Sequence, residues 1–107
     1  MTVWTVPATV VSVVDGDTAH LVLDLGWHIT FTARVRVAGI NAPELNTDAG
    51  VAAKAFAETL LPAGTSVTFT SHTLDKWGRP LGAITLPGCA DFAAAMLDAG
   101  HAVVMVF

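Results

Sequence analysis

Three short clusters of polar residues hold the side chains in this chain that are best suited to chemistry. They read "DGDT" at residues 15–18, "ARVRVAGINAPEL" at residues 33–45 and "DKWGRP" at residues 75–80. Each has a plain structural explanation, namely a hairpin turn, a polar strand face followed by a loop, and a charged turn. Separately each indicates little, and their interest lies in their combination.

The chemistry that these side chains offer is that of phosphate esters and hard cations. Carboxylate oxygens at a tight turn can hold calcium or magnesium, although one carboxylate does not suffice. In the second cluster, Arg36 offers a two-pronged contact to a phosphate, Asn41 a neutral oxygen ligand, and Glu44 an acceptor for a proton from water. In the third, Arg79 offers a second phosphate contact, and Trp77 could stack on a base or pack on the fold.

Basic residues are scarce in this chain. It has five Lys and Arg against nine Asp and Glu, and its net charge is −4. Arg34 and Arg36 alternate with valines, so we expect a strand that projects both side chains from one face. Either they solvate that face or they bind an anion. Because tight electrostatic binding of nucleic acid needs a broad basic surface, only a local phosphate site is expected.

Length and composition indicate one folded domain over residues 1–107. Hydrophobic residues make up 53% and charged residues 13%, which excludes a disordered chain. No apolar run reaches the roughly 18 residues that a membrane-spanning helix requires. The N-terminus lacks the pattern of a secretion signal, so we expect a cytoplasmic protein with no membrane partner.

Cysteine and histidine contribute no separate site. The lone Cys89 cannot form an internal disulfide, fits a reducing compartment and is expected to be a small core residue. The histidines lack close metal-ligand spacing, so we interpret them as structural or surface residues. They are His20, His28, His72 and His101.

Hydrophobic periodicity predicts strands interrupted by two helices. Alternation places Ala19, Leu21, Leu23 and Leu25, and then Ile29, Phe31, Ala33, Val35 and Val37, on one apolar face. In the first helix, Ala52, Phe56 and Leu60 recur every four residues, and residues 46–48 supply the cap. In the second, Asp91 favours the N-terminus and Gly100 the end. The predicted strands are 6–14, 18–25, 29–37, 67–70 and 81–86, with a short one in 101–107; the helices run to about 61 and over 90–99.

Three hairpin-connected strands, a helix and two more strands give the order of an OB-fold, a mainly β, five-stranded Greek-key barrel. The ordered motifs "VVDGDT", "RVRVAGINAPE" and "DKWGRPLG" resemble the staphylococcal (micrococcal) nuclease family, also called thermonuclease. The similarity runs from about Val10 to Val106. It implies an OB-fold endonuclease, a hydrolase that cuts phosphodiester bonds of DNA and RNA with calcium or another divalent cation. Family members are often secreted.

The resemblance also implies metal ligands. Asp17 corresponds to the family's calcium-binding aspartate, and Ala42 lies where a backbone carbonyl ligates the metal. Asn41 falls where the family has a second calcium-binding aspartate, so one negative charge is missing. The site is therefore expected to bind metal more weakly, to be supported by Asp15, or to be lost.

Catalytic and substrate-binding roles follow from the same resemblance. Arg36 and Arg79 correspond to the two arginines that contact the scissile phosphate. Glu44 corresponds to the glutamate proposed as general base toward the attacking water. Lys76 and Trp77 take the places of nucleotide-contacting residues, with Trp77 replacing a tyrosine.

Two further departures from the family concern the loop over residues 45–50, which looks shorter, and the last residues. The sequence stops after the last predicted strand, whereas the family usually continues into a C-terminal helix. The apolar "AVVMVF" is therefore expected either to be buried in the domain or to pair with a second copy as a homodimer.

Three functions remain open from the sequence. The retained Asp17, Arg36, Glu44 and Arg79 favour a metal-dependent nuclease. Asn41 and the acidic net charge favour a weakened or inactive OB module that binds nucleic acid or protein. A domain that keeps the fold only for structure or assembly is the third.

Overall fold

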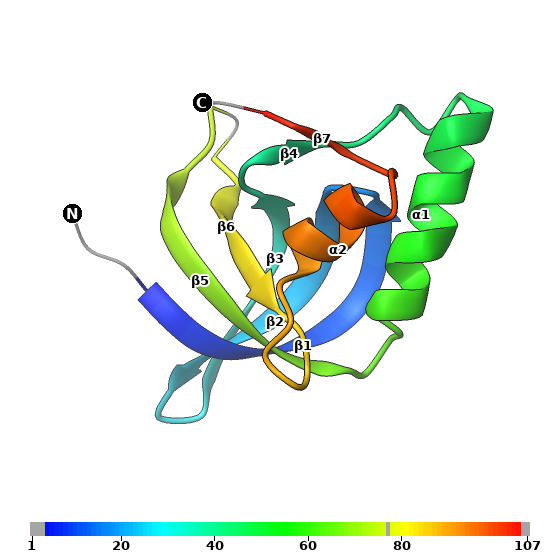
Figure 1. Cartoon of the computed structure of the whole chain (residues 1–107). Helices are drawn as coiled ribbons and strands as arrows, with labels where there is room; N and C mark the ends of the chain where they lie inside the picture. Colours follow the sequence, from blue (N-terminus) through cyan, green and yellow to red (C-terminus); the bar gives the residue numbers. More distant parts are fainter. Residues whose placement is uncertain (1–3, 77, 106–107) are drawn as a thin grey trace.

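The protein forms a closed β-barrel with two helices packed on it, as the strand order predicted. The structure is a computed structural model and describes residues 4–76 and 78–105. The barrel has the strand order β1-β2-β3-β6-β5, and β4 and β7 form a separate pair (Figure 1). The elements are β1 (Trp4–Asp15), β2 (Thr18–Gly26), β3 (Ile29–Val37), β4 (Ile40–Asn41), α1 (Asp48–Leu60), β5 (Ser66–Leu74), β6 (Pro80–Thr85), α2 (Phe92–Asp98) and β7 (Val103–Val104).

Barrel closure brings the three polar clusters to one end of the molecule. Thr18 on β2 pairs with Arg36 on β3, and Arg36 pairs with Leu81 on the parallel neighbour β6. The turn before Thr18 and the turn before Leu81 therefore both flank the end of β3. β1 pairs with both β2 and β5, and its pairing with β2 shifts register after Val10 and after Val13. Such bulges bend a strand, which lets β1 curve between its two neighbours.

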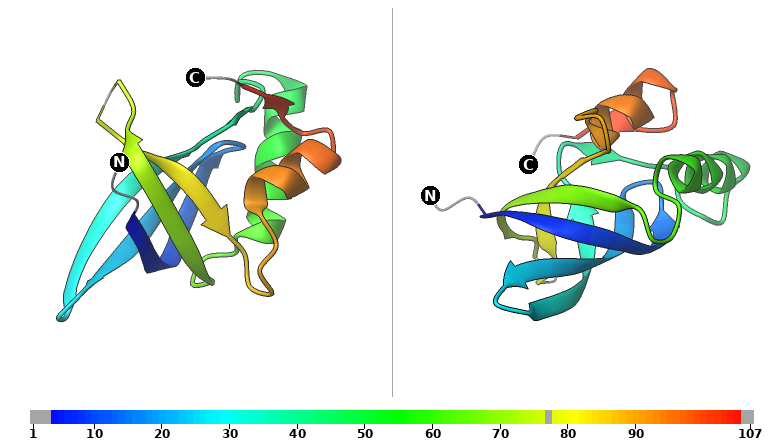
Figure 2. Two further views of the ribbon diagram at one scale, coloured as in Figure 1. Left: turned by 60° about the vertical axis from the view of Figure 1, so that its left-hand side comes forward. Right: turned by 90° about the horizontal axis from the view of Figure 1, so that it is seen from below.

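The core is built from alternate residues of these strands. Ala19, Leu21 and Leu23, together with Ala33, Val35 and Val37, are buried as the alternation predicted. Leu25, Ile29 and Phe31 were predicted on the same apolar face but are exposed. The reason is that the β2–β3 hairpin extends beyond the rest of the barrel, so its last residues lack neighbours to pack on (Figure 2).

Helix α1 packs on the barrel through its smallest residues. Thr47 is the N-cap, within the predicted capping residues, and its hydroxyl accepts a hydrogen bond from the Gly50 N–H at 3.0 Å. The fully buried positions are Gly50, Ala53 and Ala57. The predicted stripe was therefore misplaced: Ala52 is exposed, and the other two members, Phe56 and Leu60, lie half-buried beside the true contact face. Small side chains let the helix approach the barrel more closely than large ones would.

The segment after α2 returns to the barrel. Asp91 caps α2 by accepting a hydrogen bond from the Ala94 N–H at 3.1 Å, and Gly100 has a φ of 76°, as expected for a helix end. The following strand is shorter than the predicted 101–107: β7 pairs with β4, an element that the sequence did not predict (Figure 1). Residues 106–107 lie outside the described residues.

The prediction of a buried Cys89 is wrong. Cys89 is exposed, in the turn between β6 and α2, with a φ of 70°. Its N–H donates to the carbonyl of Leu86 at 3.0 Å, which closes the turn. A short apolar residue next to glycine thus serves a turn and not the core. Within residues 4–76 and 78–105, no helix is long and apolar enough to cross a membrane.

Gly50 is the position where helix packing bears most directly on the polar clusters. A Cβ built there would lie 1.7 Å from the Glu44 carbonyl oxygen. We therefore expect Gly50→Ala to lower the free energy of unfolding by about 1–3 kcal/mol, although alanine is the better helix former. Ala52→Gly, at an exposed site in the same helix, controls for helix propensity and should cost about 1 kcal/mol. Urea denaturation measures both. A more stable Gly50→Ala protein would contradict this packing.

Candidate functional site

A cleft of about 510 Å³ lies at the end of the barrel where the clusters meet. It takes residues from the β1–β2 turn, the end of β3, the segment from β4 to Glu44, the β5–β6 turn and the C-terminal segment. Every predicted site residue that the structure describes lies on its wall; Trp77 is outside the described residues. The lining residues are Asp15, Asp17, Thr18, Arg36, Asn41, Ala42, Pro43, Glu44, Asp75, Lys76, Arg79 and Met105.

A buried acid–base pair forms the floor of this cleft. The carboxylate of Asp17 lies 3.4 Å from the Nη2 of Arg36, and both side chains are about nine-tenths buried. Asp17 Oδ2 also accepts a hydrogen bond from the Ala42 N–H at 2.9 Å, and Oδ1 accepts one from the Thr18 hydroxyl at 3.0 Å. One carboxylate thus joins the β1–β2 turn to β3 and to the segment after β4.

Arg36 is held by main-chain carbonyls as well. Its Nη1 donates to the Val37 carbonyl at 2.7 Å, and its Nη2 donates to the Ile40 carbonyl at 2.8 Å. The sulfur of Met105 lies 3.7 Å from Nη2. A guanidinium has five N–H donors, and these contacts leave only part of it for a ligand. Arg36 therefore shapes the turn between β3 and β4 in addition to facing the cleft.

Arg34 and Arg36 lie on the same face of β3, as the alternation predicted, but their surroundings differ. Arg34 is exposed, and its Nε donates to the Nε2 of His20 at 3.3 Å. Arg36 is 8% exposed. Both leave the same face of β3, but the turn to β4 and the C-terminal segment cover only the Arg36 end. Strand alternation fixes the face of a residue and not what packs over it.

Asp15 and Asp17 form an interacting carboxyl pair. Burial raises the pKa of Asp15, and its contact with the Asp17 side chain raises the pKa further. Burial alone would also raise the pKa of Asp17, but hydrogen bonds from Asp15 and the Ala42 amide, together with the Arg36 charge, hold the pKa of Asp17 below its usual value. The folded state thus favours the ionised form of Asp17 and disfavours the ionised form of Asp15.

Glu44 is presented by the start of helix α1. Its main-chain carbonyl accepts hydrogen bonds from the Thr47 N–H at 3.1 Å and from the Thr47 hydroxyl at 2.6 Å. The same hydroxyl caps the helix at Gly50. The side chain of Glu44 is exposed on the cleft wall, so water reaches it. A helix cap therefore fixes the backbone from which this carboxylate projects.

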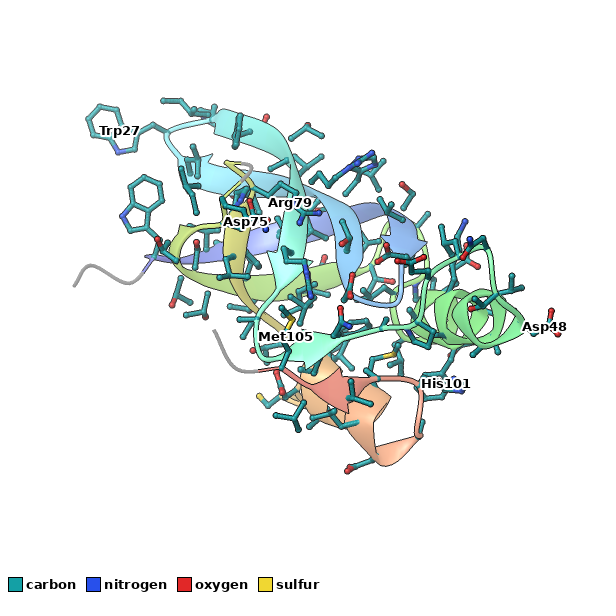
Figure 3. All side chains as sticks on the ribbon, turned by 90° about the horizontal axis from the view of Figure 1, so that it is seen from above. Trp27, Asp48, Asp75, Arg79, His101 and Met105 are labelled. Atoms are coloured by element: carbon teal, nitrogen blue, oxygen red, sulfur yellow. The ribbon has the colours of Figure 1, made fainter. Side chains whose placement is uncertain are left out.

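The β5–β6 turn supplies the remaining cationic groups. Asp75 Oδ2 accepts a hydrogen bond from Arg79 Nε at 2.6 Å, and Asp75 Oδ1 accepts one from the Arg79 N–H at 2.9 Å. Figure 3 shows Asp75 and Arg79 together on this turn. Lys76 is exposed at the same edge of the cleft. Asp75 thus holds both the side chain and the main chain of Arg79 and fixes its guanidinium beside the cleft.

The donor set fits a hard divalent cation with a small number of charged ligands. Two carboxylates at the Asp15–Asp17 turn interact unfavourably with each other, which a bound cation would relieve. Asn41 and Ala42 line the same cleft, and the neutral oxygens that they offer are an amide oxygen and a main-chain carbonyl. No group of three or more His, Cys, Asp or Glu side chains within the described residues is close enough together to hold a metal ion.

Among the residues that line the cleft, sequence analysis assigned no role to Thr18, Asp75 or Met105. The Thr18 hydroxyl donates a hydrogen bond to Asp17. Asp75 and Arg79 form an ion pair, and their opposite charges four residues apart could have indicated it. Met105 gave no signal, because an apolar residue in an apolar tail resembles core. The histidines that the structure describes in contacts act structurally: His20 bonds Arg34, and the His101 ring stacks on Phe56 with centroids 4.9 Å apart.

The closed five-stranded barrel, with a cleft at one end that arginines and carboxylates line, places this protein in the class of OB-fold proteins. Residues 34–107, more than half of the chain, match the sequence model of the family described as staphylococcal nuclease homologue, and the chain belongs to this family. The matched segment includes the third cluster and all but the first residue of the second, whereas the first cluster precedes it. Comparison with curated proteins gave no match.

The structural role of Arg36 can be separated from any role in binding. Arg36→Met would leave the buried Asp17 without its ion pair and two carbonyls without their donor. We expect the free energy of unfolding to fall by about 3–5 kcal/mol. Arg34→Met, at an exposed site on the same strand, should change it by less than about 1 kcal/mol. Guanidinium denaturation measures both, and equal effects would contradict the assignment.

The carboxyl pair predicts opposite pH effects for two similar substitutions. Because the pKa of Asp15 is raised in the folded state, its ionised form destabilises the protein at neutral pH. Asp15→Asn should therefore raise the melting temperature at neutral pH and have little effect well below the ordinary pKa of 3.8.

Asp17→Asn should do the reverse. Its lowered pKa means that it stabilises the folded protein above 3.8, and that this stability is lost as the pH falls through the lower, folded-state value. Thermal denaturation in a chelating buffer tests both variants without bound cations. A lower melting temperature for Asp15→Asn at neutral pH would refute the assignment of the pair.

Proposed function

We propose that this protein is a divalent-cation-dependent nuclease that hydrolyses phosphodiester bonds of DNA, RNA or both. The observation that carries the proposal is the convergence of Asp17, Arg36, Glu44 and Arg79, from four separate parts of the chain, on one cleft. Membership in the staphylococcal nuclease homologue family supports it. The cleft contains an acid that water reaches and two guanidinium groups that an anion would meet.

Glu44 is the proposed general base. Its carboxylate is exposed in the cleft and its backbone is fixed by the cap of α1, so it accepts a proton from a water held beside the substrate. Arg79 is the principal phosphate ligand. Its orientation is preset by Asp75, so little side-chain ordering is needed on binding, and its charge offsets the negative charge that develops on the phosphoryl oxygens.

Arg36 has a second role in this proposal. Most of its hydrogen bonds hold the turn between β3 and β4, and its remaining capacity faces the cleft beside Asp17. Its main contribution to the site is therefore positive electrostatic potential at the floor of the cleft, and not a two-pronged hydrogen-bonded contact to a phosphate. This division of labour differs from the symmetric pair of phosphate contacts that the resemblance implies.

Calcium, or another hard divalent cation, is the proposed cofactor. Asp15, Asp17, the amide oxygen of Asn41 and the carbonyl of Ala42 would hold it. When bound, the cation supplies Lewis-acid polarisation of a phosphoryl oxygen. Because Asn41 replaces a carboxylate, the ligands carry little negative charge. We therefore expect this site to bind the cation more weakly than a site with three carboxylates.

A nucleic-acid-binding module without cleavage is the second candidate. Two observations favour it: the hydrogen bonds of Arg36 to its own chain, and the absence of a third acidic group beside Asp15 and Asp17 within the described residues. In this case the cleft would bind a phosphate through Arg79 and Lys76, and the cation site would be unused.

A cleavage assay tests the nuclease proposal. Purified protein is incubated with single-stranded DNA or RNA in calcium, magnesium or manganese, or with a chelator. We expect cleavage that requires a divalent cation and falls about 100-fold or more in Glu44→Gln, because a general base contributes about that much. Glu58→Gln, an exposed glutamate on α1 away from the cleft, is the matched control and should cleave normally.

Absence of cleavage with every cation, or equal rates for Glu44→Gln and the control, would reject the enzyme. Fluorescence anisotropy with labelled oligonucleotides then decides the second candidate. Binding that is lost in Arg79→Ala, with folding intact, would favour the binding module. Arg79 is the better variant for this purpose, because removal of Arg36 also destabilises the fold.

A further inference from the structure

An apolar surface lies at the open mouth of the barrel, where the β2–β3 hairpin extends past the other strands. We call it the mouth patch. The adjoining cleft is separate from it: Leu74 and Pro80 face the mouth, whereas Asp75 and Arg79, on the same turn, face the cleft. The patch comprises the exposed side chains of Trp4, Leu25, Trp27, Ile29, Phe31 and Leu74.

The size of the mouth patch is that of a protein–protein interface. Trp27 is 94% exposed and Trp4 62%. With about 150–250 Å² for a whole aromatic side chain, the six side chains present roughly 700 Å² of apolar surface. That exceeds the roughly 300–600 Å² of the largest patch on a typical monomer. It approaches the roughly 800 Å² that each partner buries in a standard interface.

Trp27 sits at the tip of the hairpin in a strained backbone conformation. Trp27 and His28 form the two-residue turn between β2 and β3, with φ values of 57° and 62°. Turns of this kind favour Asn and Gly, because a bulky residue at positive φ costs conformational energy. A fully exposed indole held in such a position has no folding explanation within its own chain. Figure 3 shows Trp27 at the end of the molecule farthest from Asp48.

Beside this projecting side chain lies a groove. It has a volume of about 170 Å³, and its walls include Trp4, Leu23, Phe31, Phe69 and Leu74. The mouth patch therefore carries both a projecting aromatic group and an apolar recess. In an interface with twofold symmetry the same surface must fit itself, and a surface with both a projection and a recess can do so.

The charges of this region argue against other occupants. Neither the mouth patch nor the residues lining the groove include Lys or Arg. Single-stranded nucleic acid and anionic membranes both require cationic groups beside the aromatic ones. The net charge of −4 adds to this. An apolar protein surface is the occupant that the chemistry fits, and its size and its paired knob and groove fit a second copy of this chain.

We propose that the mouth patch is a homodimer interface in which Trp27 of each copy enters the groove of the other. This interface is distinct from pairing through the C-terminal residues Val103 and Val104, which are also exposed. The cleft takes Asp75, Lys76 and Arg79 from the β5–β6 turn, whereas the groove takes Leu74 and Pro80, so the interface and the cleft use different residues of this turn. The interface does not depend on the nuclease proposal.

Sedimentation of the full chain from about 1 to 200 μM tests the dimer, since a patch of this size supports micromolar or tighter association. We expect a concentration-dependent dimer that Trp27→Gly weakens at least about 30-fold, as for an interface hot spot. At the lowest concentration, Trp27→Gly should melt no earlier than the wild type, because glycine relieves the strained turn. Trp27→Asn, which suits the same backbone, is a second variant with the same expectation.

Val51→Ser is the matched control, because Val51 is an exposed apolar residue on α1 outside the patch, and it should leave the dimer unchanged. Val104→Ser tests the C-terminal segment. A wild-type chain that is monomeric throughout the range overturns the proposal. So does a dimer that survives both Trp27 variants, or one that only Val104→Ser abolishes.

Discussion

The buried contact between Asp17 and Arg36 is the interaction on which the arrangement of this molecule's polar end depends. Asp17 accepts a hydrogen bond from the backbone after β4, and Arg36 donates to the carbonyls that precede it, so together they join the β1–β2 turn to the chain from the end of β3 to Ala42. Burying two charges is costly, and the cost is offset only when hydrogen bonds satisfy both groups. Here main-chain groups satisfy them, so the pair shapes loops that strand pairing does not reach.

Much of the barrel could be predicted from the sequence because its causes are local. Alternation at Leu21, Val35 and their neighbours, the cap at Thr47 and the helix end at Gly100 each depend on a few adjacent residues. The burial of Arg36, the pairing of β4 with β7 and the exposure of Phe31 depend on what another segment covers. Such facts are set by tertiary packing, and no pattern within one strand reports them.

The candidate site was predictable for a different reason. Its residues were recognised by the order of three motifs along the sequence. The fold explains why these motifs meet in space, because β3 pairs with β2 on one side and with β6 on the other. The connections within the site were not predictable. Main-chain carbonyls hold Arg36, whereas the side chain of Asp75 orients Arg79. These contacts depend on distances that a sequence motif does not contain. Three of the five Lys and Arg residues of this acidic protein, namely Arg36, Lys76 and Arg79, thereby line one cleft.

The pairing of β4 with β7 has a consequence for the order of events during synthesis. The strand that carries Asn41 is paired only when Val103 has been made, and Arg36 gains its contact with Met105 later still. A nascent chain that has released the barrel strands but not these residues therefore holds an unfinished cleft. Assembly of the site is therefore coupled to the synthesis of residues 103–105, which follow the strand that carries Asn41 by about sixty residues.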